Sequence, residues 1–281
     1  MKNALIYSFL LLLTAGLFSS CQERIELELN DEGQQRLVVE GWFTDQLQQQ
    51  EIKLTLTSSY FSNQAAPPAS DAIVTVTNGE QTWEFEEQFP GIYRTPLEVF
   101  GEPEKWYTMN VDYNGEQYEA TSYMRTVAPV DSLHVKVVDP LVEFGFPGDL
   151  YYSVRLWTQE LPGVGDHYMW ITSVNGFPVR DTLNELTLVS DGLFDGAYVA
   201  DIEIDFLEID TEASIGDTVS IEQWNIGLEA YDTFFAILNE TIFNGGIFDA
   251  PPANVQSNIS NGALGYFGAA GVSTKSTVIE E

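Results

Sequence analysis

The sequence predicts an all-β protein whose N-terminal part is an immunoglobulin-like or transthyretin-like sandwich. A second antiparallel β domain with one packed α-helix is expected to follow it. Two observations predict this class. Short runs of alternating apolar and polar residues, bounded by Gly, Asn, Asp and Pro, recur along the 281-residue chain and are typical of sandwiches and barrels. Asn-Gly pairs follow three of these runs, and this dipeptide favours the tight turn of a β-hairpin.

The first 20 residues have the layout of a lipoprotein signal peptide. One lysine precedes an apolar run at residues 4–18, and two serines come directly before Cys21, the single cysteine of the chain. The run is shorter than the roughly 20 residues that a membrane-spanning helix needs. The segment resembles the lipobox of bacterial lipoproteins, with Phe18 in place of the usual leucine, and this implies that Cys21 is the lipid-attachment residue. An ordinary secretory signal with an incidental cysteine is the alternative.

Lipid at Cys21 predicts a protein that is anchored in a membrane without crossing it, because several acyl chains together give stable attachment. The expected location is the outer membrane. Gln22 and Glu23 loosely resemble the acidic signals that send such lipoproteins to the cell surface, although Arg24 interrupts that pattern. We therefore expect a surface-exposed protein, or otherwise one that faces the periplasm.

Residues 21–126 are expected to form the first sandwich. An Ala- and Pro-rich stretch at residues 63–70 predicts a surface loop. Asn78-Gly79 and Asn114-Gly115 are expected to close hairpins through type I′ turns, because both residue types tolerate positive φ. The expected strands are residues 37–43, 52–56, 73–77, 82–85, 107–113 and 117–121.

Residues 127–281 are expected to form the second β domain, beyond a hinge at Pro129. Apolar residues three or four positions apart predict a helix over residues 228–243, and Asn244-Gly245-Gly246 provides its stop. A last strand is expected at residues 262–278. The other expected strands are residues 133–138, 151–158, 167–174, 182–189, 198–209 and 218–224.

The segment at residues 248–267, FDAPPANVQSNISNGALGYF, is too idiosyncratic for a generic β protein. Together with LVVEGW at residues 37–42, SYF at 59–61 and FDG at 194–196, it resembles the domain of unknown function 4249 family, lipoproteins of Bacteroidetes. Members commonly occur with energy-coupled outer-membrane receptors. The resemblance therefore implies an accessory role, in binding or scaffolding, beside a TonB-dependent-type outer-membrane transporter.

The family motif implies a set of candidate residues near the C-terminus. Asparagines there can hydrogen-bond to neighbouring backbone groups, so a structural role in a backbone-dominated loop explains them without a ligand. The candidates are Pro251, Pro252, Asn254, Asn258, Asn261, Gly262, Gly265 and Tyr266.

The chain is strongly acidic, with 43 Asp and Glu against 11 Lys and Arg and a net charge of −32. The electrostatic field of so large a negative charge repels phosphate groups, which argues against nucleic acid as a partner. Residues 181–274 contain no cation, so we expect the repulsion among their carboxylates to be uncompensated within that stretch of sequence. Asp201, Glu203 and Asp205 alternate with isoleucines and are weak calcium candidates, for which a half-solvated strand face is the alternative. The oligomeric state stays open.

Nothing in the sequence indicates a catalytic site or a cofactor. It contains no nucleophile elbow, zinc-binding helix motif or phosphate-binding loop. His134 is expected on a solvated strand face, and Asp166 is expected to point away from His167. We therefore expect a non-enzymatic protein, with a carbohydrate-binding or carbohydrate-hydrolysing lipoprotein that uses paired carboxylates as the alternative. Core packing is expected for all six tryptophans, Trp42, Trp83, Trp106, Trp157, Trp170 and Trp224.

Overall fold

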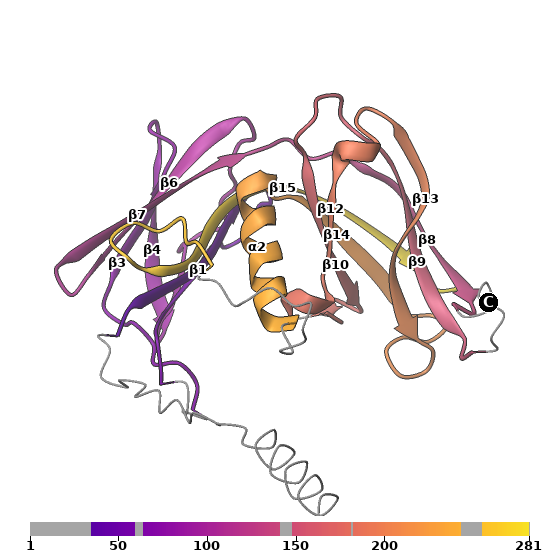
Figure 1. The fold of residues 1–281 in the computed structure, drawn as a ribbon, viewed down its shortest axis with the longest axis horizontal. Coiled ribbons are helices and arrows are strands. Elements are labelled where there is room, and N and C mark those ends of the chain that lie inside the picture. The colour runs from indigo at the N-terminus through magenta and orange to yellow at the C-terminus, as the bar shows by residue number, and fades with distance from the viewer. Residues whose placement is uncertain (1–34, 60–63, 141–147, 181, 243–254, 281) are drawn as a thin grey trace, which may run out of the picture. The chain divides into compact units, whose positions relative to one another are not determined.

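The computed structural model describes residues 35–59, 64–140, 148–180, 182–242 and 255–280 (Figure 1). The expected signal peptide, Cys21, Pro251, Pro252 and Asn254 lie outside these residues. Antiparallel strands dominate the described part, and one α-helix accompanies them, as expected for this fold class.

The first half of the described chain holds seven strands. They are β1 (Leu37–Thr44), β2 (Glu51–Leu56), β3 (Ile73–Thr77), β4 (Thr82–Phe89), β5 (Ile92–Arg94), β6 (Lys105–Tyr113) and β7 (Glu116–Met124). The second half continues with β8 (Val130–Val138), β9 (Tyr151–Gln159), β10 (His167–Val174), β11 (Phe177–Pro178), the short 3₁₀ turn η2 (Leu183–Glu185), β12 (Thr187–Ser190), the 3₁₀ turn η3 (Asp191–Leu193), β13 (Tyr198–Glu208), β14 (Thr218–Asn225), helix α2 (Gly227–Ile242) and β15 (Leu264–Val278).

Strands from both halves join into one sheet. Among the described residues, the strand order of this sheet is β11-β10-β14-β15-β1-β2-β5-β4-β3-β6-β7, and β12 pairs with β10 off this path. A separate three-stranded sheet has the order β13-β9-β8. The strand expected at residues 182–189 is interrupted, because residues 183–185 form η2 and the pairing with β10 begins only at Thr187.

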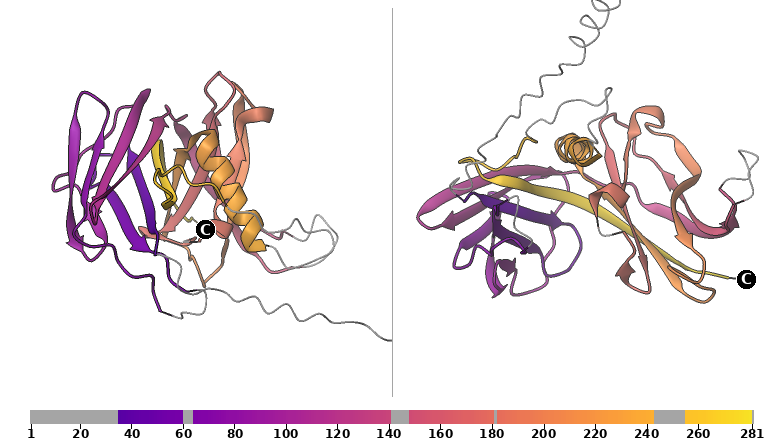
Figure 2. Two further views of the ribbon diagram at one scale, coloured as in Figure 1. Left: turned by 60° about the vertical axis from the view of Figure 1, so that its left-hand side comes forward. Right: turned by 60° about the horizontal axis from the view of Figure 1, so that its bottom comes forward.

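The C-terminal strand β15 connects the two halves of the large sheet (Figure 2). Its first part pairs in parallel with β1, from Val38↔Leu264 to Thr44↔Ala270. Its second part pairs antiparallel with β14. Strand β15, which was expected in the second domain, therefore pairs with β1 of the expected first domain. The domain boundary between residues 126 and 127 stays a prediction.

The three Asn-Gly turns close hairpins, but one of them differs from the expected type. Asn114 and Gly115 have φ of 54° and 80°, and the turn at Asn175 is similar, with φ of 52°. Asn78 does not have positive φ; only Gly79 does, with φ of 87°. The Asn78 Oδ1 accepts bonds from the backbone N–H groups of Glu80 and Gln81, at 3.0 and 2.8 Å, which produces a longer loop than a type I′ turn.

Packing divides the tryptophans between the core and the surface. Trp83 lies 4.7 Å from the ring of Phe43 in the first core, and Trp170 is 5% exposed in the second. Trp106 is 60% exposed, so its expected burial is wrong. Side chains alternate along β6, and because Tyr107 faces the core, its neighbour Trp106 faces outward.

Helix α2 covers residues 227–242, one residue offset from its expected start. Its buried Ala230 belongs to a small third cluster with Met169, Ile226 and Tyr266. Among helices in the described residues, none is long and apolar enough to cross a bilayer.

Candidate functional site

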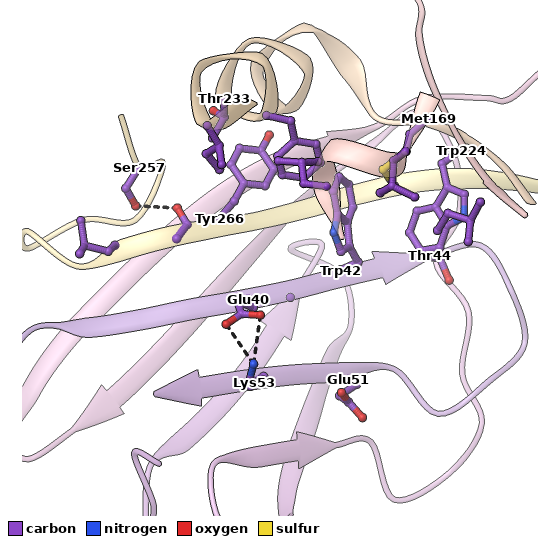
Figure 3. Close-up of a pocket in the computed structure, with 18 of the residues that line it drawn as sticks. Glu40, Trp42, Thr44, Glu51, Lys53, Met169, Trp224, Thr233, Ser257 and Tyr266 are labelled. Atoms are coloured by element: carbon purple, nitrogen blue, oxygen red, sulfur yellow. Dashed lines mark hydrogen bonds and ion pairs between the residues drawn. The ribbon is translucent and has the colours of Figure 1, made fainter. Parts of the chain in front are cut away.

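A groove with a volume of about 880 Å³ lies between helix α2 and the large sheet (Figure 3). Strands β1, β2, β10, β14 and β15 contribute lining residues on the sheet side, and η2 and α2 contribute apolar side chains on the other. We call this cavity the aromatic groove, after the four rings of Trp42, Trp224, Phe234 and Tyr266 that line it.

Trp42 lies at the centre of these rings. Its indole is 5.6 Å from the ring of Trp224, 5.9 Å from that of Tyr266 and 6.0 Å from that of Phe234, measured between centroids. These separations are typical of attractive edge and tilted aromatic pairs. Trp42 and Trp224 stay half-buried, so part of each ring system is available to contact a bound molecule.

The alternation of β1 explains why Trp42 reaches the groove. Val39, Gly41 and Phe43 are buried on one face of the strand, whereas Glu40 and Trp42 point to the other. Gly268 of β15 is the register partner of Trp42. A Cβ at Gly268 would lie 2.2 Å from the indole ring, so the absence of a side chain at this position makes room for Trp42.

Helix α2 provides the apolar wall of the groove through Phe234 and Ile237. Thr233 also lines it, but its hydroxyl already donates a bond of 2.8 Å to the carbonyl of Glu229 within the helix. The wall therefore contacts a ligand chiefly through carbon atoms.

Charged side chains lie along the sheet side of the groove. Glu40 and Lys53 face each other across β1 and β2, with Nζ and Oε1 3.1 Å apart (Figure 3). Glu51 forms an ion pair of 2.6 Å with Arg94. Each groove carboxylate therefore has its own cation, an arrangement that suits orientation of a polar ligand group better than proton transfer.

Comparison with known protein families identifies the family of the chain. The family model Domain of unknown function (DUF4249) matches residues 22–276. The chain belongs to this family. Among curated proteins, none matches the chain.

Residues of the DUF4249 motif near the C-terminus hydrogen-bond to the backbone of β15, next to the groove. The Asn258 Nδ2 donates to the carbonyl of Phe267 at 2.7 Å, and its Oδ1 accepts from the Phe267 N–H at 3.1 Å. The Ser257 hydroxyl donates to the Gly265 carbonyl at 2.9 Å (Figure 3). Asn258 thus binds backbone, as the sequence predicts, and holds residues 257–259 against the start of β15.

The remaining described motif residues shape the backbone or line the groove. Asn261 and Gly262 turn the chain with φ of 54° and 74°, and the Gly262 carbonyl accepts a 2.7 Å bond from Arg36 Nε. Gly265 has φ of 92°, and a Cβ there would lie 1.9 Å from the carbonyl oxygen of Val39. Tyr266 is 7% exposed, and burial raises the pKa of its phenol.

Two carboxylates of the acidic strand β13 in this DUF4249 domain form ion pairs with cations of other strands. Asp201 contacts Lys136 at 2.9 Å and Arg155 at 2.8 Å, and Glu203 contacts Arg155 at 2.9 Å. Hydrogen bonds from Lys136 and Arg155 lower the pKa of the Asp201 carboxyl. The compensation of Asp201 and Glu203 therefore comes from β8 and β9, outside the stretch of sequence that contains no cation.

Asp205, the third calcium candidate, has a different environment. It lies 3.3 Å from Arg180, and burial raises the pKa of its carboxyl. The pairing of β13 with β9 shifts register between Val199 and Ile202 and again between Glu203 and Asp205. These irregularities break the regular alternation that the sequence suggested.

The histidines have separate surroundings. His134 is exposed, and its ring lies 4.7 Å from that of Trp157. His167 is buried, with Nδ1 3.0 Å from the carbonyl oxygen of Gly165, whereas Asp166 pairs with Arg125 at 3.2 Å. Sequence reasoning missed the groove itself, because it assigned Trp42 and Trp224 to the core.

Proposed function

We propose that this protein is a non-enzymatic binding protein of the cell envelope, anchored in the outer membrane by lipid at Cys21. In this proposal it binds a ligand in the aromatic groove and acts beside an outer-membrane transporter. The observation that carries the proposal is the half-buried indole of Trp42, which lies among three further rings in a cavity of about 880 Å³.

The groove chemistry supports a ligand that has both a ring or apolar face and a polar group. Aromatic and aliphatic side chains can contact the apolar face, while the ion pairs of Glu40 with Lys53 and of Glu51 with Arg94 are placed to meet polar groups. Concave, mostly apolar cavities with a few polar groups are the usual form of small-molecule sites.

The location rests on the N-terminal sequence. Cys21 follows a short apolar run and two serines, which favours lipid attachment. The strong negative charge of the protein favours solubility and repulsion from anionic headgroups, so that the lipid holds the domain at the membrane without drawing its surface onto it.

Ligand binding is tested with a neutral fluorescent probe, N-phenyl-1-naphthylamine. We expect its emission to rise on saturable binding to the full-length protein. Ile237→Arg places a long charged side chain in the groove and should weaken probe binding at least tenfold. Asn239→Arg, at an exposed position of the same helix that does not line the groove, is the matched control and should bind as the wild type does. Equal binding by both variants would contradict the proposal.

The transporter partner is tested by crosslinking tagged protein in intact cells. Proteins that co-purify from detergent-solubilised outer membrane are identified by mass spectrometry, with a Cys21→Ser strain as control. We expect a transporter to be enriched with the lipidated form alone. Recovery of the lipoprotein without any enriched transporter would contradict an accessory role and leave an independent binding protein.

Carbohydrate binding in the same groove is the second candidate, favoured by the partly exposed Trp42 ring. Saturable displacement of the probe by soluble oligosaccharides would support it. A hydrolase that uses Glu40 and Glu51 as paired carboxylates would in addition release new reducing ends, and Glu51→Gln should then abolish the release.

A further inference from the structure

A second cluster, outside the aromatic groove, consists of three buried carboxylates. Glu160 follows β9, Asp166 precedes β10, and Asp191 begins η3 directly after β12. Their exposed fractions are 1%, 6% and 1%. One carboxylate oxygen of each residue lies within 4.8 Å of the corresponding oxygens of the other two. None of the three lines the groove.

The strand pairing explains how residues so far apart in sequence meet. His167 of β10 pairs with Ser190 of β12, and the next backbone bond joins the Asp191 N–H to the Asp166 carbonyl at 3.1 Å. The Glu160 N–H bonds the carbonyl of Ala197 at 3.0 Å, just before β13. The cluster therefore lies where the ends of β9 and β10, from the two different sheets, come together.

The charge of the cluster is only partly balanced. Among the described residues, Arg125 is the cation that forms an ion pair with it, at 3.2 Å from Asp166. Burial raises the pKa of the Glu160 carboxyl, and the neighbouring carboxylates of Asp166 and Asp191 raise it further. Burying several carboxylates together is unfavourable unless a positive charge compensates them.

Hydrogen bonding in the cluster also leaves one oxygen free. The Asp191 Oδ2 accepts from the N–H groups of Gly165 and Asp166, at 2.8 and 3.0 Å. The Glu160 Oε1 accepts from the Tyr168 hydroxyl at 3.1 Å. The Asp191 Oδ1 is buried and has no hydrogen-bond partner among the residues that the structure describes. Native proteins rarely leave a buried carboxylate oxygen unpaired, so this atom is a candidate to bind a ligand.

We propose that Glu160, Asp166 and Asp191 bind a calcium ion. The donor set consists of carboxylate oxygens, which calcium prefers, and no His or Cys belongs to the group. Calcium–oxygen distances of about 2.3–2.6 Å allow two ligand oxygens to lie at most about 4.6–5.2 Å apart, so three oxygens that all lie within 4.8 Å of one another can contact the same ion. The ion would neutralise the surplus charge and occupy the free side of Asp191, and it would link the ends of the two sheets.

The site is distinct from the earlier calcium candidates on β13. Asp201 and Glu203 are exposed and already paired with Lys136 and Arg155. Their double variant Asp201→Asn with Glu203→Gln removes two carboxylates without touching the buried cluster and is the matched control.

The test is calorimetric titration of calcium chloride into full-length lipoprotein in detergent, after treatment with EDTA and dialysis. We expect one site and a rise of several degrees in Tm with 1 mM calcium, since a ligand that binds the native state stabilises it. Asp191→Asn should weaken calcium binding at least tenfold, and the β13 double variant should bind as the wild type does. Terbium luminescence sensitised by Tyr168 and quenched by added calcium should locate the ion.

Comparison of the Tm of Asp191→Asn with that of the wild type in EDTA distinguishes calcium binding from a purely structural role of Asp191. Asn keeps an oxygen acceptor for the Gly165 and Asp166 N–H groups and removes a like charge, so Asp191→Asn should equal or exceed the wild type in EDTA and fall below it in calcium. The proposal is overturned if calcium produces neither heat nor a Tm shift, or if Asp191→Asn binds calcium as tightly as the wild type. Binding that disappears only in the β13 double variant would also overturn it.

Discussion

Trp42 of β1 and Trp224 of β14 meet edge to face, 5.6 Å between centroids and 79° between ring planes, although β15 lies between their strands. The contact is possible because Gly268 of β15 stands opposite Trp42 without a side chain. The aromatic groove therefore depends on a glycine that contributes no surface to the ligand.

Gly268→Ala is expected to destabilise the fold and deform the groove. Its Cβ would lie 2.2 Å from the rigid indole ring, and overpacking of this kind costs about 2 kcal/mol. Urea denaturation should show this loss, and probe binding should weaken in the same variant. Gly192→Ala is the control, because the nearest atom to its Cβ would be the Ser190 hydroxyl at 3.8 Å. Equal stability of the two variants would contradict this explanation.

Local signals account for the parts of the fold that the sequence predicted well. Alternation and Asn-Gly turns act over a few residues, so the turn between β6 and β7 at Asn114 and Gly115 was predicted, and α2 begins one residue from its expected start. The burial of Trp106 was predicted wrongly, because its sequence neighbours did not show that Tyr107 would take the core-facing position.

The candidate sites depend on contacts between distant parts of the chain, which local patterns do not encode. Arg36 bonds Gly262 across 226 positions of sequence, and the same pairing of β1 with β15 places Tyr266 beside Trp42. The buried carboxylates likewise lie just beyond the ends of separate strands, so no short stretch of sequence contains all three.

Asn258→Ala is expected to lower the free energy of unfolding by about 2 kcal/mol, because it removes two hydrogen bonds to the backbone of Phe267. Asn258→Asp keeps the shape and the acceptor but places a carboxylate beside the Phe267 carbonyl, so it should be at least as destabilising at neutral pH. Urea denaturation measures both variants. Asn239→Ala, at an exposed position of α2, should stay within about 0.5 kcal/mol of the wild type.

Acid stability is expected to depend on Glu212. Hydrogen bonds from Arg180 lower the pKa of the Glu212 carboxyl, so its charged form stabilises the folded state. This contribution is complete above the unfolded pKa of about 4.3 and is lost as the pH falls through the lower folded pKa. Glu212→Gln should therefore have a lower Tm than the wild type at pH 7, and this difference in Tm should become smaller near pH 3.

A series of thermal denaturation curves between pH 7 and pH 3 tests this difference. Glu208→Gln, which removes an exposed carboxylate of the same region, should follow the wild-type pH dependence. A constant Tm difference between Glu212→Gln and the wild type across the whole range would assign the effect to packing and not to charge.

Two glycines with similar backbone angles are expected to respond differently to alanine. Gly115 and Gly265 have φ of 80° and 92°, so a side chain is strained at either position. Nothing lies within 4 Å of a Cβ at Gly115, whereas a Cβ at Gly265 would lie 1.9 Å from the Val39 carbonyl oxygen. Gly115→Ala should therefore cost about 1 kcal/mol, measured by urea denaturation.

Gly265→Ala should be far more damaging, because backbone atoms of β1 would have to move and the parallel pairing of β1 with β15 would open at Val39↔Gly265. We expect a loss of more than about 3 kcal/mol or little folded protein, measured as soluble yield and circular dichroism. Probe binding by any folded fraction should also fall, since Tyr266 follows directly in the strand. Equal costs at the two glycines would show that backbone strain, and not the close approach of the strands, explains why glycine stands at residue 265.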